Sequence, residues 1–390
     1  MKFSRRAQRT TRSAIGQMLA AANGKSCISF AGGLPDESLF PCRELGEIMK
    51  EVVAGQGEQI LRYSDTAGSA RLREQISRRM AQLHKGCVDK EQIIITNGSQ
   101  QGIDLAGRAF LDEGDMVLIE SPSYVDALNV FKSYGAELKA VPSDKDGMIP
   151  EALEAILAEN SRIKFIYVIT DFQNPTGKRW SLARRKALME LADRYDVAVI
   201  DDAPYSELNY DKEELPSLLE LDTQGRTIFL GSFSKTLAPG MRIGWLAAGK
   251  ELISLFTVLK EGADIHSANP TQEAAAEYMS RYDMNDHVAA ICKVYKARRD
   301  AMDSALHQYF PKQAKWVKPA GGFFFWVELP ETINATEKIS SAIENGVVYV
   351  PGTAFYAEGG NHHTLRLNFT HMSEEDIDRG IRVLGKLFSE

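Results

Sequence analysis

The sequence lacks the features that would place it at once among membrane, disulfide-rich or disordered proteins. No apolar run approaches the roughly 18 residues that a membrane span requires, so we expect no membrane-spanning segment. The four cysteines form no Cys-x-x-Cys pair, and no histidine lies at zinc-ligand spacing. We therefore expect reduced thiols in the cytoplasm and no metal site. No low-complexity segment interrupts the chain, which indicates packed domains rather than tethered ones.

Acidic residues outnumber basic ones overall but are absent from the first 35 positions. The 46 basic and 53 acidic residues give a net charge of −7, so we expect no nucleic-acid partner. The basic N-terminal segment is typical of an organellar transit peptide. It is equally typical of an amphipathic helix whose basic face meets solvent or the protein's own acidic surface. Its basic residues are Lys2, Arg5, Arg6, Arg9, Arg12 and Lys25.

Apolar segments alternate with amphipathic helical segments over residues 91–247, which is typical of an α/β fold with a mostly parallel sheet. A chain of 390 residues that is 44% hydrophobic is long enough to bury a large core. Most of the predicted strands end in polar or Gly/Pro-rich loops, where α/β proteins bind ligands. The strands are predicted at 91–96, 116–120, 165–170, 197–200, 227–230 and 243–247.

The pattern changes after about residue 271. One long, charged helix is predicted up to His307, and shorter strands follow it. This order predicts a smaller C-terminal α+β domain joined to the first by a long helix. Its strands are predicted at 323–329, 347–351 and 364–369, with a final helix from residue 373.

The segment from Gly231 to Gly244 carries the clearest chemical signal. Lys235 lies in a turn of small residues after a strand. Partial burial there would lower its pKa and suit its amine to attack on an aldehyde. Ser232, Ser234 and Arg242 would form an anion site beside it. An amine next to an anion site is what an enzyme that uses pyridoxal 5′-phosphate (PLP) needs.

This segment resembles the lysine signature of the class I/II aminotransferases, which are PLP-dependent enzymes of fold type I. The resemblance extends from the segment 30–35 (FAGGLP) to Arg366. It is strongest to the branch that contains kynurenine and 2-aminoadipate aminotransferases and the aminotransferase-like half of MocR-type regulators. It implies a large domain with a mostly parallel seven-stranded sheet flanked by helices, and a smaller α+β C-terminal domain. The implied divisions are an N-terminal arm or lid (1–40), a large PLP-binding domain (41–275) and a small domain (276–390).

The resemblance implies a role for each polar residue around the cofactor ring. Lys235 would bind PLP covalently and later act as the base. Asp202 would face the pyridine nitrogen and keep it protonated. Asp201 is the alternative, but neighbours on a strand point to opposite faces, and the family's spacing to Tyr205 favours Asp202. Asn174 and Tyr205 would hydrogen-bond the phenolate oxygen of PLP.

The resemblance also implies a site for the cofactor phosphate. Ser99 and Gln100 begin a helix after a strand, where backbone N–H groups and the helix dipole favour an anion. Ser232, Ser234 and Arg242 would complete this cup.

The remaining implied residues contact the ring face, the partner subunit or the substrate. Tyr124 would stack on the ring. Tyr63 would reach the phosphate of the neighbouring subunit, which implies a homodimer with shared active sites. Arg366 would pair with the substrate α-carboxylate through both guanidinium nitrogens, beside Asn174 and Gly33. The arm would then cover the cleft as a lid or form a dimer contact, a role we favour over targeting.

We therefore expect ping-pong transamination of an L-amino acid with a 2-oxo acid, and 2-oxoglutarate as the acceptor. Two alternatives stay open. The same fold and cofactor support a lyase, a decarboxylase or a racemase. A non-catalytic domain that senses PLP or an amino acid, as in MocR-type regulators, is the other. The sequence leaves the amino donor open among 2-aminoadipate, aromatic, branched-chain and specialised amino acids.

Overall fold

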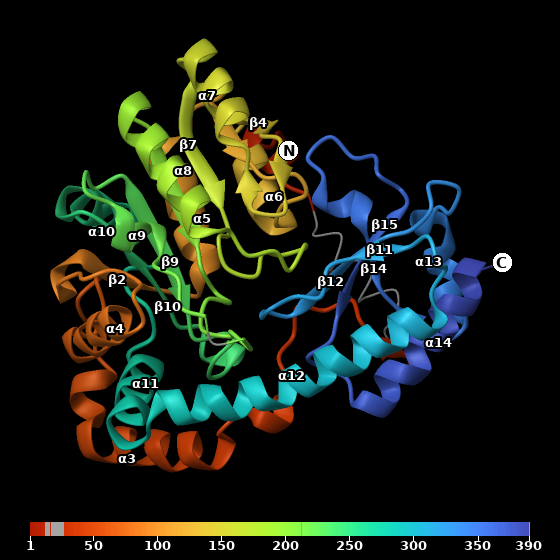
Figure 1. Ribbon diagram of the computed structural model, residues 1–390. Helices are drawn as coiled ribbons and strands as arrows, with labels where there is room; N and C mark the ends of the chain where they lie inside the picture. The colour runs from red at the N-terminus through yellow and green to blue at the C-terminus, as the bar shows by residue number, and fades with distance from the viewer. Residues whose placement is uncertain (12–15, 17–26, 212, 390) are drawn as a thin grey trace.

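The computed structural model describes residues 1–11, 16, 27–211 and 213–389, and Figure 1 shows two layered regions bridged by one long helix. Within the described residues, no helix is long and apolar enough to cross a membrane.

A seven-stranded sheet forms the centre of the larger region, in the order β2-β10-β9-β8-β7-β3-β4. All of its strands run parallel except β10, which is antiparallel to both neighbours. The predicted α/β architecture with a mostly parallel sheet is confirmed. The strands are β2 (Ile93–Thr96), β3 (Met116–Ile119), β4 (Glu137–Ala140), β7 (Ile163–Val168), β8 (Ala198–Asp202), β9 (Thr227–Ser232) and β10 (Gly244–Ala247).

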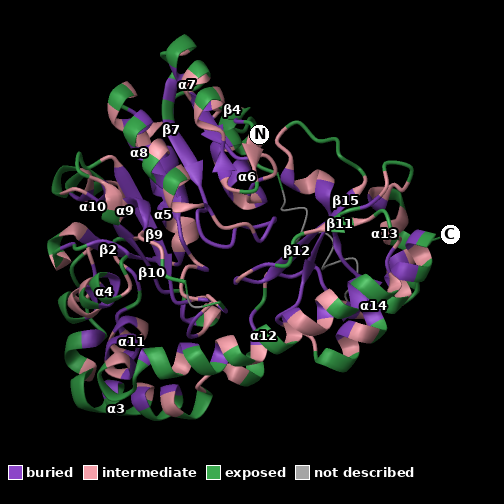
Figure 2. Cartoon of the chain, in the orientation of Figure 1, coloured by how far each residue is buried: buried purple, intermediate pink, exposed green. Residues whose placement is uncertain are grey.

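The edge strand β4 was not among the strands predicted from the sequence. Its residues ELKA are mostly exposed, so it has no apolar run by which a buried strand is recognised. The central strands are buried along almost their whole length, because helices cover both faces of the sheet (Figure 2).

Helices pack around this sheet and expose their outer faces (Figure 2). Several follow a strand directly, so that their N-termini lie at the carboxyl ends of the parallel strands. The helices of this region are α3 (Cys42–Ile60), α4 (Ala70–Gln82), α5 (Ser99–Phe110), α6 (Val125–Ser133), α7 (Pro150–Glu159), α8 (Leu182–Tyr195), α9 (Leu218–Leu221), α10 (Lys250–Asp264) and α11 (Asn269–Arg281).

The single long helix predicted over residues 271–307 is wrong, because two helices occupy this range. The first is α11, and the second is α12 (Met284–Tyr309), which runs beneath both regions in Figure 1. Asp283 caps α12 and accepts a hydrogen bond from the backbone N–H of Asn285. Such an N-cap residue starts a new helix. The pattern of charged residues does not change at Asp283, and it therefore suggested one continuous helix.

The smaller region is built on an antiparallel sheet in the order β11-β12-β15-β14. The predicted strand at 347–351 is two short strands in different sheets: β13 pairs with the N-terminal β1, whereas β14 pairs with β15. The boundaries at residues 40 and 275 stay predictions. The elements are β1 (Ile28–Ser29), β11 (Lys315–Trp316), β12 (Phe324–Glu328), α13 (Ala335–Glu344), β13 (Val347–Val348), β14 (Val350–Pro351), β15 (Thr364–Asn368) and α14 (Glu374–Ser389).

The N-terminal helix α1 (Arg5–Arg9) docks on α6. Arg5 and Arg9 both form ion pairs with Glu113, and the Arg6 guanidinium lies 4.0 Å from the ring centre of Tyr134. The basic face of this helix thus meets the protein's own surface. Positions 12–15 and 17–26 of the predicted lid lie outside the described residues, so the lid stays a prediction.

Candidate active site

A cavity of about 290 Å³ lies at the carboxyl ends of the parallel strands, between the sheet and β15 of the smaller region. We call it the strand-end cavity. Every residue predicted for the site lines it except Tyr63. They come from both regions and from the segment Gly32–Leu34, so the fold gathers groups that are more than 300 residues apart in sequence.

Lys235 lies in the turn after β9, and its Nζ donates a hydrogen bond to the carbonyl oxygen of Gly33 at 2.8 Å. Within the described residues it forms no ion pair with a carboxylate. Burial, together with repulsion from Arg366 and Arg242, lowers its pKa to about 8, although the nearby Asp202 opposes the shift. A lysine in this state supplies neutral amine near physiological pH.

Asp202 ends β8 and turns its carboxylate into the cavity. Its Oδ2 accepts a hydrogen bond from the Tyr167 hydroxyl at 2.7 Å, whereas its buried Oδ1 has no partner among the described residues. Burial raises its pKa to about 7, and Asp201 adds to this effect. Asp201 itself points to the opposite face, where it accepts hydrogen bonds from Thr170 Oγ1 at 3.0 Å and the Leu218 N–H at 3.2 Å.

Arg366, on β15, is fully buried in the wall opposite. Its Nη1 donates to Asn174 Oδ1 at 2.8 Å, and its Nη2 donates to the carbonyl oxygen of Ala31. The guanidinium lies 4.2 Å from the ring centre of Phe324, which in turn packs edge-on against Tyr205. Burial lowers the pKa of Arg366 to about 10. Among the described residues, its hydrogen bonds go only to neutral acceptors.

The start of α5 forms one end of the cavity. Gly98 caps the helix with φ of 75° and without a side-chain hydrogen bond, so the N–H groups of Ser99 and Gln100 belong to its first, uncapped turn. Arg242 donates from Nη2 to the carbonyl oxygen of Asn97 at 2.7 Å. A Cβ on residue 98 would lie 2.3 Å from the same Nη2, so only glycine lets the guanidinium lie against this turn.

Two further groups complete the wall. Ser232 Oγ donates to Ser234 Oγ at 2.9 Å and accepts from the Ser234 N–H at 3.1 Å. The Tyr124 hydroxyl lies 3.1 Å from Asp126 Oδ2 and 3.5 Å from Gln100 Oε1. Burial raises the pKa of Tyr124 well above its ordinary value, so its phenol stays protonated.

Tyr63 lies outside the cavity with 80% of its surface exposed. Its ring packs edge-on against His266, with 5.9 Å between the ring centres. Its predicted contact with a neighbouring subunit stays a prediction.

The sequence interpretation did not identify Tyr167, Asp126 or Leu34 as part of the site. Leu34 belongs to the segment 30–35 (FAGGLP), of which only Gly33 was predicted to contact the substrate. Tyr167 stands inside an apolar strand, and only the pairing of β7 with β8 brings its hydroxyl to Asp202. Strand order would have been needed to find it.

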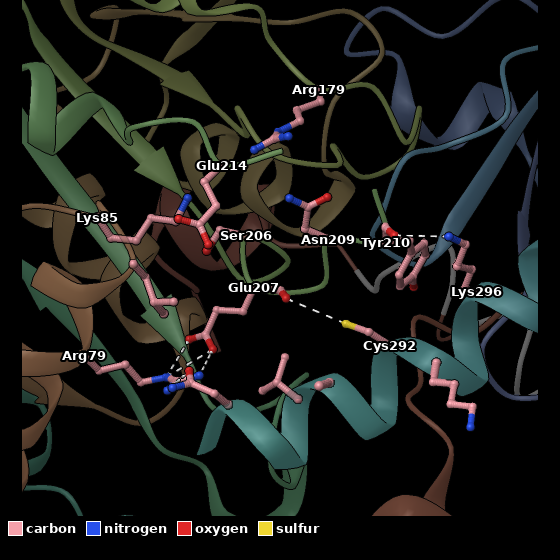
Figure 3. Close-up of a pocket in the computed structure, with 15 residues that line it drawn as sticks. Arg79, Lys85, Arg179, Ser206, Glu207, Asn209, Tyr210, Glu214, Cys292 and Lys296 are labelled. Carbon is pink, nitrogen blue, oxygen red and sulfur yellow. Dashed lines mark hydrogen bonds and ion pairs between the residues drawn. The ribbon is translucent and has the colours of Figure 1, made fainter. Parts of the chain in front are cut away.

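A larger cavity of about 460 Å³ lies between α12, the end of α4 and the loop after Tyr205 (Figure 3). We call it the α12 cavity. Its buried charged groups are paired: Arg79 bonds to Glu207, and Lys85 Nζ lies 3.3 Å from Asp171 Oδ2. Lys293 and Lys296 also line it, but both are exposed. Burial raises the pKa of Cys292 to about 12, which makes its thiol a poor nucleophile. Among its described lining residues, the α12 cavity therefore offers no activated group.

Comparison with known proteins identifies the family. The family model for aminotransferase class I and II matches residues 26–384. The chain belongs to this family. It is 40% identical over 392 residues to aromatic-amino-acid aminotransferase 1 of Thermococcus litoralis, covering 100% of this chain and 94% of that protein.

Two solved aminotransferases share the fold over almost the whole chain. The kynurenine aminotransferase of Pyrococcus horikoshii, in complex with PMP, is 38% identical with a TM-score of 0.94, covering 99% of this chain and 96% of that one. The alpha-aminoadipate aminotransferase of Thermus thermophilus, complexed with N-(5′-phosphopyridoxyl)-L-leucine, is 36% identical with a TM-score of 0.92, covering 99% of this chain and 97% of that one. The protein is a PLP-dependent aminotransferase of fold type I.

The strand-end cavity fits PLP on its own geometry. The unpartnered Oδ1 of Asp202 suits a protonated ring nitrogen, and the uncapped first turn of α5 suits a phosphate. Lys235 lies in the same cavity and supplies the amine for the aldehyde. The cavity thus contains groups that suit the ring nitrogen, the phosphate and the aldehyde of the cofactor.

Proposed function

We propose that this aminotransferase moves the amino group of an aromatic L-amino acid to a 2-oxo acid, with 2-oxoglutarate as the acceptor, in a ping-pong reaction. The aromatic donor is supported by the 40% identical relative of that name. Leu34 and Tyr124 in the cavity wall offer apolar surface for its ring. The described lining holds only three basic side chains, each of which the proposal uses elsewhere: Lys235, Arg242 and Arg366.

PLP supplies an aldehyde that links to an amine and a protonated ring that withdraws electrons from the substrate Cα. Lys235 binds the cofactor covalently in the resting enzyme. With a substrate amine in its place, the neutral amine of Lys235 would take the proton from the substrate Cα and deliver it to the former aldehyde carbon of PLP. A pKa of about 8 suits a base for this transfer near physiological pH.

Arg366 binds the substrate α-carboxylate. Its two terminal nitrogens now bond to Asn174 and to the carbonyl oxygen of Ala31. A carboxylate gives this buried cation a charged partner in place of a neutral carbonyl, which strengthens the interaction. When the substrate carboxylate replaces the Ala31 carbonyl on Arg366, the segment that carries Ala31 and Gly33 loses a hydrogen bond. Substrate binding is therefore coupled to the position of this segment.

Asp202 holds the proton of the ring nitrogen, and the hydrogen bond from Tyr167 fixes its orientation. Asn174 and Tyr205 bind the phenolate oxygen of the ring, and Tyr124 stacks on its face. The phosphate is bound by the first turn of α5 together with Ser232, Ser234 and Arg242. Tyr63 completes the phosphate site of a second copy, so the working enzyme is a homodimer.

One observation carries the proposal: a lysine with a lowered pKa shares a cavity with an unpartnered carboxylate oxygen and a buried arginine. The test is a half-reaction in which the purified holoenzyme meets one amino acid at a time, and the PLP absorbance is followed. We expect phenylalanine, tyrosine and kynurenine to convert the bound PLP fully to pyridoxamine phosphate, and 2-oxoglutarate to restore it better than pyruvate.

Each outcome of this experiment decides between functions. Stoichiometric pyridoxamine phosphate excludes the lyase, decarboxylase and racemase alternatives, since those reactions return PLP unchanged. Bound PLP that no amino acid converts would contradict the proposal and favour the sensing domain. Conversion by 2-aminoadipate or branched-chain donors alone would contradict the aromatic assignment.

A further inference from the structure

Asp264, the last residue of α10, does not line the strand-end cavity but binds the turn that does. Its Oδ2 accepts hydrogen bonds from Asn97 Nδ2 at 2.6 Å and Gln101 Nε2 at 2.7 Å. Lys260 Nζ donates to both carboxylate oxygens, at 2.7 and 2.8 Å. One carboxylate thus joins the end of α10 to the start of α5.

Asn97 is held at its backbone N–H, its carbonyl oxygen and its side-chain NH₂ group. Its backbone N–H donates to Gln101 Oε1 at 2.9 Å, and its carbonyl oxygen accepts from Arg242 Nη2 at 2.7 Å. Its side-chain amide donates to Asp264. Because Gln101 also bonds to Asp264, the carboxylate fixes both the side chain and, through Gln101, the backbone of residue 97. Gly98 and the first turn of α5 follow directly.

A simpler explanation for the position of Asp264 is that it serves only as the counter-ion of Lys260. The Lys260 side chain is fully buried, and burial lowers its pKa while Asp264 opposes the shift. An ion pair accounts for the contacts between these two residues. It does not account for the two amides from Asn97 and Gln101, both of which belong to the turn at the cavity end.

We propose that Asp264 is a positioning residue for the cofactor phosphate. It holds Asn97 so that the N–H groups of the first turn of α5, and Arg242 on the carbonyl of Asn97, keep a fixed direction toward the phosphate. Anion sites built from backbone N–H groups depend on such support, because a small rotation of the turn redirects every donor. This inference rests on the phosphate site in the proposed function.

The test compares the affinity of the full-length chain for PLP and for pyridoxal, which lacks the phosphate. We expect Asp264→Asn and Asn97→Ala to weaken PLP binding about tenfold and to leave pyridoxal binding unchanged. Lys260→Met is the matched control, since it removes the ion pair and keeps both amide contacts, and it should retain the affinity for PLP. If Asp264→Asn does not fold because Lys260 is left buried without a counter-ion, the double variant Lys260→Met/Asp264→Asn is compared with Lys260→Met.

An unchanged affinity for PLP in Asp264→Asn, or equal weakening of PLP and pyridoxal, would overturn the proposal. Equal losses in Lys260→Met and Asp264→Asn would assign the effect to the ion pair and overturn it as well. A wild-type chain that binds PLP no better than pyridoxal would instead contradict the phosphate site itself. The two failures are therefore distinguishable.

Discussion

The α12 cavity and the strand-end cavity hold their buried charged side chains in opposite electrostatic states. In the larger α12 cavity, Arg79 is paired with Glu207 (Figure 3). Lys85, in the same wall, is paired with Asp171. In the smaller strand-end cavity, Lys235 donates only to a backbone carbonyl, and one oxygen of Asp202 has no partner among the described residues. The α12 cavity has the larger volume, yet the buried groups without a charged partner lie in the strand-end cavity. Charges that the protein leaves unpaired at a cost in stability indicate a site built for a ligand.

Replacement of Lys235 should produce the largest difference between the cavities. Lys235→Ala removes both the cofactor link and the base, so we expect kcat to fall by about 10⁴. Lys296→Ala in the α12 cavity is the control and should leave kcat unchanged. Transamination rates and the PLP absorbance of both variants measure this. Near-normal turnover by Lys235→Ala would contradict the assignment.

Asp202→Asn should separate activity from stability. We expect kcat to fall by about 10³, because an amide cannot hold the ring proton. Burial raises the pKa of Asp202 from 3.8 to about 7, so its ionisation disfavours the folded PLP-free chain increasingly as pH rises from 4 to 7, and that cost persists above 7. The PLP-free variant should therefore melt at a higher temperature than the PLP-free wild type at pH 8.

Glu207→Gln in the α12 cavity is the opposite case. It breaks a buried ion pair, so we expect a loss of about 3 kcal/mol in unfolding free energy and an unchanged kcat. Thermal melts and rate assays give the melting temperature and kcat of Asp202→Asn and of Glu207→Gln. A fall in kcat for Glu207→Gln, with an unchanged kcat for Asp202→Asn, would place the active site in the α12 cavity instead.

Arg366→Lys should act mainly on substrate binding. Lysine cannot form the paired hydrogen bonds of a guanidinium with a carboxylate, so we expect kcat/KM to fall by about 10² through KM. Arg179→Lys is the control, because Arg179 donates to Asp171 at 2.9 Å in the wall of the α12 cavity. It should lower stability and leave KM unchanged. Steady-state kinetics with one donor decide between these outcomes.

The pH dependence of cofactor uptake gives the smallest predicted effect. Only the neutral amine of Lys235 attacks an aldehyde, and its pKa is about 8. The rate of PLP attachment to the full-length PLP-free chain should therefore rise about tenfold from pH 6 to 7 and level off above 8. Stopped-flow absorbance measures it. A rate that keeps rising to pH 10 would indicate an ordinary lysine.

The sequence predicted where the large-domain residues of the cavity lie, because their position follows a local rule. Asn174, Asp202 and Lys235 stand where strands pass into polar turns, and parallel strands place such turns at one edge. The roles of Asn174, Asp202 and Arg366 were inferred only from the family resemblance. For Arg366 the pattern favoured the opposite, since an arginine on a strand is usually solvated. Its burial depends on packing against Phe324 across the antiparallel pair of β12 and β15.

Other parts of the molecule depend on contacts that no local pattern contains. Tyr167 and Asp264 act through partners that the fold alone brings near. The exposed edge strand β4 and the break between α11 and α12 were missed or misread, because composition there does not change enough to mark them. The prediction was limited because contacts between residues far apart in the sequence cannot be read from local patterns.

The most direct test of the central claim is to find the lysine that binds PLP. Borohydride reduction of the holoenzyme fixes the cofactor on its lysine, and peptide mass spectrometry then locates it. We predict one modified site, at Lys235 in the strand-end cavity. Labelling at Lys85, Lys293 or Lys296 of the α12 cavity, with Lys235 unmodified, would contradict the account.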